Sequence, residues 1–418
     1  MTAYHTHQLP NGLRIIHLPS DSKVVFCGYA VKAGTRHERQ GEEGLAHFCE
    51  HLSFKGTQRR SAVQIINALE GVGGELNAFT NKEDTVYYAA ITNDHLSAAV
   101  DVLSDMVFFS QFPEHEMEKE CEVVCDEIES YEDSPAELIY DEFENILFSG
   151  HPLGHNILGT AERVRSYRPA HARAFTQRYY QPANCIFFAS GQLDFNRLVR
   201  MLEKATLAVP AADLSAQAEG TVTKDAAICP DLSAQTQQPI IRQRGTHQAH
   251  VMIGTRTFPV SDDRRWALCL LNNILGGPGM NSRLNLSLRE RNALVYTVES
   301  TMVSYSDTGL WTVYFGCDPH DVNRCLRLVR RELNRCMQQP LSKSALAKAK
   351  QQMKGQLTIA SDHREQYALD FAKNFLHQGK ERHLNDILAH LEALSETDIQ
   401  QVAQQLFAPE RLVTLIYE

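Results

Sequence analysis

The sequence feature that most constrains the fold is an internal repeat with a spacing of about 230 residues. The stretches 143–191 and 371–418 each combine helical patterns, a Gly, an aromatic-x-Pro turn and a final apolar strand. The stretches 24–40 and 249–265 also correspond, because each is an alternating strand that enters a helix through a polar turn. The repeat predicts two domains of similar topology, and chance likeness between amphipathic helices is the alternative.

The order of patterns within each half predicts an α+β fold. Strands are expected at 12–18, 24–31 and 75–91 in the first half, followed by long helices, and the second half repeats this order. Such blocks favour an antiparallel-rich sheet with helices packed on one face. We expect an N-terminal domain at 1–212 and a C-terminal domain at 239–418. A linker is expected at 213–238, which is rich in Ala, Ser, Thr, Gln and Pro.

Charge and composition exclude several classes of function. The formal net charge is -10 and no basic block is present, which argues against a nucleic-acid-binding protein. No apolar run approaches the ~18 residues of a membrane helix, and no export or import pattern marks the start. The ten Cys contain no CxxC pair, which is typical of reduced thiols. We therefore expect a cytoplasmic protein with no membrane or nucleic-acid partner.

The stretch "GLAHFCEHLSFKGT" at 44–57 sets two His residues and a Glu on one predicted helix, 43–53. His47 and His51 are at positions i and i+4, so both rings can face one cation. Glu50 sits near that face, where it can accept a proton from water without binding the metal. Zn2+ suits this donor set. Two surface His residues on an acidic helix are the alternative, because short motifs recur by chance.

A second acidic helix pattern, "EKECEVVCDEIESYED" at 118–133, offers a third metal ligand. Glu120 and Glu127 are seven residues apart and project from one side of the helix. A solvated acidic face is the alternative for most of the other acids. Cys121 and Cys125 are also at i and i+4 and can bind zinc, but no matching second pair follows, which favours core thiols.

Together these segments resemble the inverted-zincin peptidases, the family of pitrilysin, insulysin and the mitochondrial processing peptidase. The resemblance is carried by "HFCEH", "LSFKGT", "GGELNAFTNKEDTVYY", "GHPLGHNILGT" and "GGPGMNSRLNLSLRERNALVYTVES", and runs nearly the whole chain. The length is similar to that of the family's short branch. There, one subunit holds two related domains and forms half of a clamshell chamber that a second subunit closes.

The resemblance implies a role for each matching residue. His47, His51 and Glu127 would bind one Zn2+ per chain, and Glu50 would be the general base. Glu120 would support the metal-binding helix without binding the metal itself. The substrate-binding residues implied by the same matches are an edge strand that binds peptide backbone and an Arg and Tyr at the scissile bond: Asn77, Ala78, Phe79, Arg289 and Tyr296.

The second half departs from the family's metal pattern. It has "ALCLLNNILGG" where the first half has the two His residues, so we expect it to bind no metal. In the family, a basic residue and a Gly usually precede the Leu of this segment, whereas "ERNALVY" has Asn292 and Ala293 there. Pro278 in addition stiffens a Gly-rich loop. We therefore expect altered loop geometry around Arg289 and Tyr296.

The sequence favours a zinc-dependent endopeptidase that hydrolyses unfolded peptides or presequence-like segments in a dimeric chamber. The partner is expected to be an identical chain or a paralogue. One alternative is a non-catalytic, peptide-binding chamber subunit that serves an active partner. Another is a hydrolase of a different substrate, in which the "LNAF" strand would bind no peptide.

Overall fold

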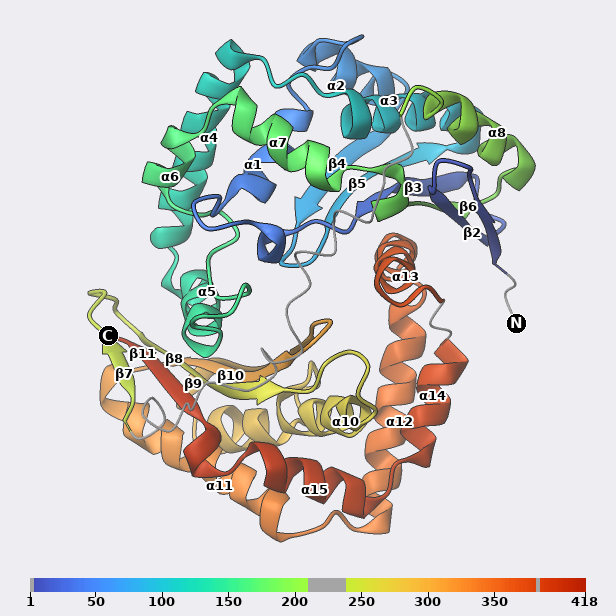
Figure 1. The fold of residues 1–418 in the computed structure, drawn as a ribbon. Coiled ribbons are helices and arrows are strands. Elements are labelled where there is room, and N and C mark those ends of the chain that lie inside the picture. The colour runs from blue at the N-terminus through green and yellow to red at the C-terminus, as the bar shows by residue number, and fades with distance from the viewer. Residues whose placement is uncertain (1–3, 210–237, 381–383) are drawn as a thin grey trace. The chain divides into compact units, whose positions relative to one another are not determined.

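The chain folds into two compact units, shown as a ribbon in Figure 1. This computed structural model describes residues 4–209, 238–380 and 384–418, so almost all of the predicted linker lies outside the described residues. The first unit comprises the described residues within Met1–Ser130, His155–Thr221 and Ser361–Arg382. The second comprises the described residues within Tyr131–Gly154, Val222–Ala360 and His383–Glu418.

The first unit is built on a sheet with the strand order β1-β2-β6-β3-β5-β4. Every pair is antiparallel except β2 with β6. The strands are β1 (His5–Gln8), β2 (Arg14–Pro19), β3 (Val24–Val31), β4 (Glu75–Thr80), β5 (Thr85–Thr92) and β6 (Cys185–Gly191). The helices are α1 (Leu45–Ser53), α2 (Ala62–Glu70), α3 (Leu96–Phe109), α4 (Glu114–Glu132), α6 (Ala161–Ser166), α7 (Pro169–Tyr179), α8 (Phe195–Ala205) and α13 (Arg364–Gln378).

The second unit repeats this topology, with the strand order β7-β11-β8-β10-β9. Only β7 and β11 pair in parallel, as β2 and β6 do in the first unit. The predicted duplication is therefore confirmed. The strands are β7 (Ile240–Arg242), β8 (Ala249–Thr257), β9 (Val295–Ser304), β10 (Gly309–Cys317) and β11 (Val413–Tyr417). The helices are α5 (Pro135–Leu147), α10 (Arg264–Gly276), α11 (Val322–Gln338), α12 (Lys343–Ala360), α14 (Leu384–Ala393) and α15 (Glu396–Leu406).

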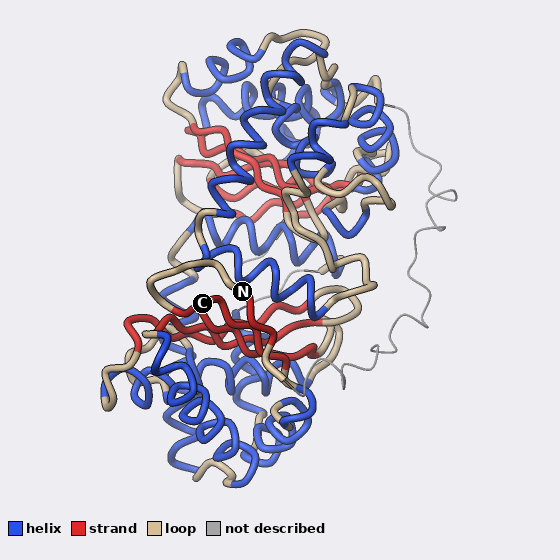
Figure 2. Tube along the Cα trace, turned by 90° about the vertical axis from the view of Figure 1, so that its left-hand side faces the viewer, coloured by secondary structure: helices blue, strands red, loops and turns tan. Residues whose placement is uncertain are grey.

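Both faces of the first sheet are apolar, and helices cover both. Successive residues of a strand point to opposite faces. Ile15 and Phe187 belong to the large core beneath α1, α3 and α7, whereas Ile16 and Phe188 contact α13 on the other face. Figure 2 shows most helices of the unit on one side of its strands. The predicted helical layer on one face is thus present, and α13 adds a second layer.

The helices α5 and α13 are exchanged between the two halves of the sequence. α5 follows α4 in the first half but packs on the second sheet through Ile139 and Phe143. α13 lies in the second half but packs on the first sheet. The compact units therefore differ from the continuous halves 1–212 and 239–418. The physical reason is that each sheet has a second apolar face that the helix of the other half buries.

No helix among the described residues is both long and apolar enough to cross a membrane.

A buried hydrogen bond between a histidine and a carboxylate fixes α13 to the β4–β5 turn. His377 Nε2 donates to Asp84 Oδ2 over 2.9 Å, and Asn81 Nδ2 donates to Asp84 Oδ1 over 2.7 Å. Burial favours the neutral carboxyl, but the hydrogen bond from His377 holds the pKa of Asp84 below its ordinary value. The charged carboxylate is therefore the stable form in the fold.

We predict that His377→Leu lowers the free energy of unfolding of the first unit by about 2 kcal/mol, because it removes a hydrogen bond to the buried Asp84 carboxylate. Because the folded pKa is depressed, this contribution is full above the unfolded value of about 4 and is lost as pH falls through the folded value. Urea unfolding at pH 7 and at pH 3 measures it. The double variant Asp84→Asn, His377→Leu should recover part of the loss, and an equal loss would contradict the account based on this hydrogen bond.

Candidate metal centre

The position of α1 is set by a buried carboxylate that precedes it in the chain. Glu38 has no exposed side-chain surface, and its two oxygens accept hydrogen bonds from the backbone N–H groups of Gly44 (3.0 Å) and Ala46 (2.7 Å). His155 Nε2 contacts the same carboxylate at 2.8 Å. Gly44 adopts φ +88, and a Cβ there would lie 2.5 Å from the Leu158 carbonyl oxygen. These contacts fix the position of the first turn of α1.

Two faces of α1 have different tasks. Phe48, Cys49 and Leu52 are fully buried in the core. His47 and Glu50 lie on the other side and are still 7% and 8% exposed, whereas His51 is more open. The helical spacing thus brings two imidazoles and a carboxylate to one place.

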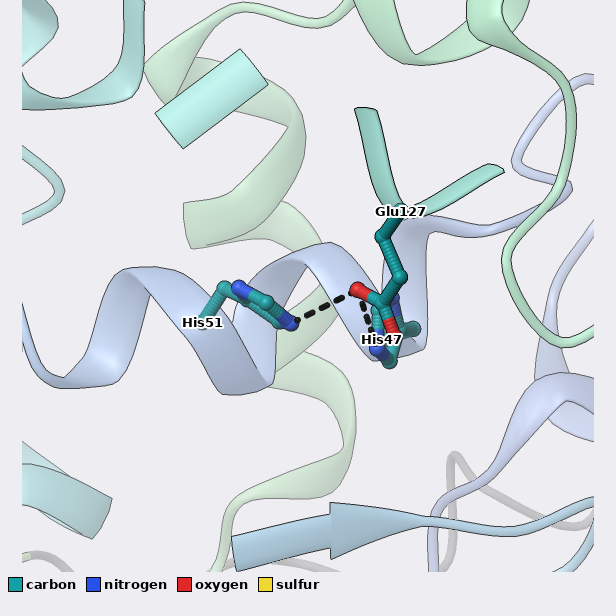
Figure 3. Close-up of side chains that lie close together, drawn as sticks. All are labelled: His47, His51 and Glu127. Atoms are coloured by element: carbon teal, nitrogen blue, oxygen red, sulfur yellow. Dashed lines mark ion pairs between the residues drawn. The ribbon is translucent and has the colours of Figure 1, made fainter. Parts of the chain in front are cut away.

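The helix α4 brings Glu127 to the two imidazoles (Figure 3). Buried Val124 and Ile128 hold this part of α4 against the core. Glu127 Oε2 lies 3.8 Å from His47 Nε2 and 3.5 Å from His51 Nε2. The three donor atoms lie within 4.8 Å of one another, and no other such group of His, Cys, Asp or Glu occurs among the residues searched, which are the described ones.

Glu120 contacts this centre through the other ring nitrogen of His51, Nδ1. His51 Nδ1–H donates to Glu120 Oε1 over 2.9 Å, which fixes the ring so that Nε2 faces Glu127. Lys55 Nζ is 2.6 Å from Glu120 Oε2. Such a carboxylate behind a metal-binding His holds its tautomer and orientation. Glu120 occupies the position that this supporting role requires, and the role itself stays a prediction.

The pKa values of the two His residues reflect the electrostatic environment of the centre. Burial and the nearby His51 lower the pKa of His47 to about 4, so its ring is neutral near pH 7, the form that binds a metal. Burial also disfavours charged His51, but its hydrogen bonds to Glu120 and Glu127 raise its pKa to about 9. These carboxylates attract positive charge, and a divalent cation would displace that proton.

The donor set fits a zinc ion. In a tetrahedral site with Zn–N and Zn–O bonds of ordinary length, the donor atoms are about 3.3 Å apart, close to the two distances from Glu127. The buried Nδ1 of His47 has no hydrogen-bond partner among the described residues, whereas Nε2 of the same ring faces Glu127. Nε2 is therefore the nitrogen that would bind a cation among the three donors.

Glu50 is held beside these donors by the strand β4. Thr80 Oγ1 donates to Glu50 Oε2 over 2.7 Å, and both residues are buried. Burial raises the pKa of Glu50. A carboxylate with a raised pKa is a stronger base, and this is the property that general-base catalysis uses.

The strand β4 also carries Asn77, Ala78 and Phe79. It lies at the edge of the first sheet and pairs with β5 on one side only. Asn77 is exposed, whereas Ala78 packs against the core and Phe79 against Tyr88. The other backbone edge of β4 has no partner strand among the described residues. This geometry allows an extended peptide to add to the sheet.

Arg289 and Tyr296 belong to the second unit. The Arg289 guanidinium lies 5.5 Å from the Tyr296 ring centroid, and Tyr296 is 81% exposed. Arg289 lies in the last turn of a π-helical segment, Asn285–Glu290, and Ala293 has φ +50. Ala293 stands where the resemblance leads us to expect Gly, which would adopt this φ without strain. The two side chains form an exposed pair, and their role remains a prediction.

Cys121 and Cys125 lie one turn apart on α4, and the Cys125 thiol donates to the Ala161 carbonyl oxygen over 4.0 Å. No third ligand joins them among the described residues.

Sequence reasoning missed three residues that the structure places around the centre, namely Glu38, Lys55 and Thr80. Only Glu38 had a usable sequence signal, as an acid ahead of a helix start.

Both halves of the chain match known family descriptions. Residues 15–161 match "Insulinase (Peptidase family M16)" and residues 168–353 match "Peptidase M16 inactive domain". A protein of Streptomyces coelicolor, named as an uncharacterized zinc protease, is 34% identical over 98% of this chain and 88% of its own length. YmxG of Bacillus subtilis, with the same description, is 33% identical over 97% of this chain and 96% of its own.

Solved structures share the fold. The crystal structure of a protease from Helicobacter pylori has a TM-score of 0.89 at 21% identity and covers 100% of this chain and 99% of that chain. A crystal structure described as peptidase M16 inactive domain, from Pseudomonas fluorescens, has a TM-score of 0.85 at 17% identity, covering 99% and 97%. At these identities the likeness establishes the two-domain architecture.

We predict that Glu127→Gln weakens zinc retention, because a neutral amide is a poorer ligand for Zn2+ than a carboxylate. The loss of affinity should reach at least the roughly 10- to 100-fold that removal of an outer partner costs. Zinc content after dialysis against a mild chelator measures it, with the exposed Glu129→Gln on the same helix as control. Equal zinc in both variants would assign the third ligand elsewhere, with Glu120 the next candidate.

Proposed function

This chain belongs to peptidase family M16, and from this premise we propose that it is a zinc-dependent endopeptidase acting on unfolded peptides or presequence-like segments. Family membership is what the sequence resemblance predicted. The single observation that carries the proposal is the convergence of His47 Nε2, His51 Nε2 and Glu127 Oε2, with Glu50 on the same helix. Relatives named as zinc proteases support zinc as the metal.

The side chains of the centre divide the chemistry among them. When bound by His47, His51 and Glu127, Zn2+ supplies a Lewis acid for peptide-bond hydrolysis. Glu50 accepts the proton of the attacking water and returns it to the leaving amine. Thr80 occupies Glu50 Oε2, so Oε1 is the oxygen that remains to take the proton. The raised pKa that burial gives Glu50 favours this transfer.

The strand β4 would bind the substrate. A peptide added along its free edge forms main-chain hydrogen bonds that do not depend on sequence, and this position lies directly beside Glu50 because Thr80 ends the same strand. Only an extended, unfolded segment can pair in this way. The proposed substrates are therefore unfolded peptides, and a hydrolase of another substrate class would leave the edge of β4 without a task.

We propose that the active form is a dimer, most simply a homodimer, whose subunits each form half of a clamshell chamber. The exposed pair Arg289 and Tyr296 supports this, because 81% of Tyr296 is accessible and available to peptide held on another chain. In this arrangement the two side chains of one subunit would stabilise the oxyanion at the metal centre of the other. A paralogue with the same residues could take the second place.

The alternative function is a peptide-binding subunit without activity of its own. The match of residues 168–353 to an inactive domain keeps this alternative open. The first unit favours the enzyme, because it retains His47, Glu50, His51 and Glu127 in one group. For location we propose the cytoplasm, where thiols stay reduced, since nine described cysteines are free.

We predict that Glu50→Gln keeps zinc but reduces the turnover of a quenched fluorescent peptide by at least about 100-fold, because an amide cannot accept a proton. Zinc content and initial rates of the same samples measure both effects. Chelator should abolish wild-type cleavage and added Zn2+ should restore it. Near wild-type turnover of the zinc-loaded variant would show that Glu50 is not the general base.

We predict that mixing inactive Glu50→Gln with inactive Tyr296→Phe restores activity after subunit exchange. In a mixed dimer one centre combines an intact Glu50 with an intact Tyr296 of the partner, so up to about half of its centres can work. Exchange is followed with subunits of different mass, and peptide cleavage is measured on the same mixture. No recovery after demonstrated exchange would place Tyr296 on the same chain as its centre or outside catalysis.

A further inference from the structure

We propose that Thr80 is a positioning residue that holds the Glu50 carboxylate in one orientation and ties it to the strand that receives the peptide. The inference rests on the proposed peptidase function and adds to it a residue that neither the family descriptions nor the motif of α1 assigns. It identifies the contact by which the edge strand acts on the proton acceptor.

The hydrogen bond between Thr80 and Glu50 is short and buried, and the Glu50 carboxylate has no other donor among the described residues. Thr80 Oγ1 lies 2.7 Å from Glu50 Oε2, and both residues are 8% exposed. Among the described residues no other hydrogen bond reaches the Glu50 carboxylate. A buried carboxylate with one donor has its orientation set by that donor, because turning away would leave the charge without any hydrogen bond.

The direction of this hydrogen bond follows from the neighbouring hydroxyl groups. Thr85 Oγ1 donates its proton to the Ala33 carbonyl oxygen over 2.8 Å, so towards Thr80 it can only accept. The Thr80 proton then has two acceptors, Thr85 Oγ1 at 3.4 Å and Glu50 Oε2 at 2.7 Å. The carboxylate is nearer and carries the charge, and charge-assisted hydrogen bonds are the stronger ones. The proton therefore points at Glu50.

The strand geometry couples this contact to the peptide edge. Leu76, Ala78 and Thr80 alternate along β4 and face the core with α1. Phe79 points to the opposite face, where Tyr88 and Lys373 surround it. The backbone edge is left for the substrate. A peptide that pairs with β4 fixes the backbone of the strand, and thereby fixes the hydroxyl that orients Glu50.

A purely structural task for Thr80 makes a different prediction. If its hydroxyl served only to satisfy a buried group, Thr80→Val would lower stability and leave the turnover of the folded enzyme intact. If it positions the base, the zinc-loaded, folded variant turns over slowly, while KM stays near the wild-type value. Thr80→Ser keeps the hydroxyl and should restore turnover.

The experiment compares Thr80→Val, Thr80→Ser and the control Thr312→Val in the zinc-loaded, full-length protein. Thr312 is a buried strand residue of the second unit whose hydroxyl lies 2.8 Å from that of Thr301. We expect Thr80→Val to lower kcat about 10- to 100-fold, as loss of part of general-base catalysis would. KM should change less than about twofold and zinc content should be unchanged, because the metal ligands are untouched. Thr80→Ser and Thr312→Val should stay within about threefold of wild type in kcat.

Crystal structures of the metal-free variants give a readout that does not depend on activity. We expect a single Glu50 orientation in wild type and Thr80→Ser, and a displaced or divided carboxylate in Thr80→Val. Wild-type kcat in Thr80→Val, an equal loss in Thr312→Val, or an unchanged Glu50 in the Thr80→Val structure would each overturn the inference. A wild-type protein that binds zinc but cleaves no peptide would instead refute the proposed function, and the Glu50 positions would still decide the role of Thr80.

Discussion

The candidate centre depends on one buried carboxylate, that of Glu38. Its two oxygens accept the backbone N–H groups of Gly44 and Ala46, which open α1 and have no partner inside the helix. The negative charge also lies at the positive end of the helix dipole. With the first turn fixed, the positions of His47, Glu50 and His51 follow from helical geometry alone. A shift of this turn would move all three side chains at once.

The centre is electrostatically balanced for a cation. Glu50, Glu120 and Glu127 approach the two imidazoles, and among the described residues Lys55 is the permanent positive charge in contact with this group. The positive charge of Lys55 neutralises the negative charge of Glu120. The negative charge of Glu127 is then available to bind a metal, and that of Glu50 to accept a proton. The neutral ring of His47 completes a donor set that needs added positive charge.

Local periodicity predicted which side chains could share a face, and the family resemblance predicted which of them would bind the metal. The i, i+4 spacing placed His47 and His51 on one face, and the seven-residue spacing placed Glu120 and Glu127 on one side of α4. Thr80 could not be found in this way, because alternation along β4 shows which face it shares and not which helix lies across it. The exchange of α5 and α13 escaped prediction for the same reason. An amphipathic pattern shows that a helix has a buried face, without naming the sheet that buries it.

The second unit builds the same fold around a helix, α10, that carries no His or Glu. It builds the same strand order, and its helix α10 places Leu268, Leu270 and Leu271 in the core. A helix whose buried face is entirely apolar therefore satisfies the architecture. In the first unit the equivalent helix instead buries His47 and Glu50, although partly unpaired polar groups at such depth cost stability. A functional site is the expected place for such a local conflict with the packing rules, and the conflict in one unit only therefore supports the proposed activity.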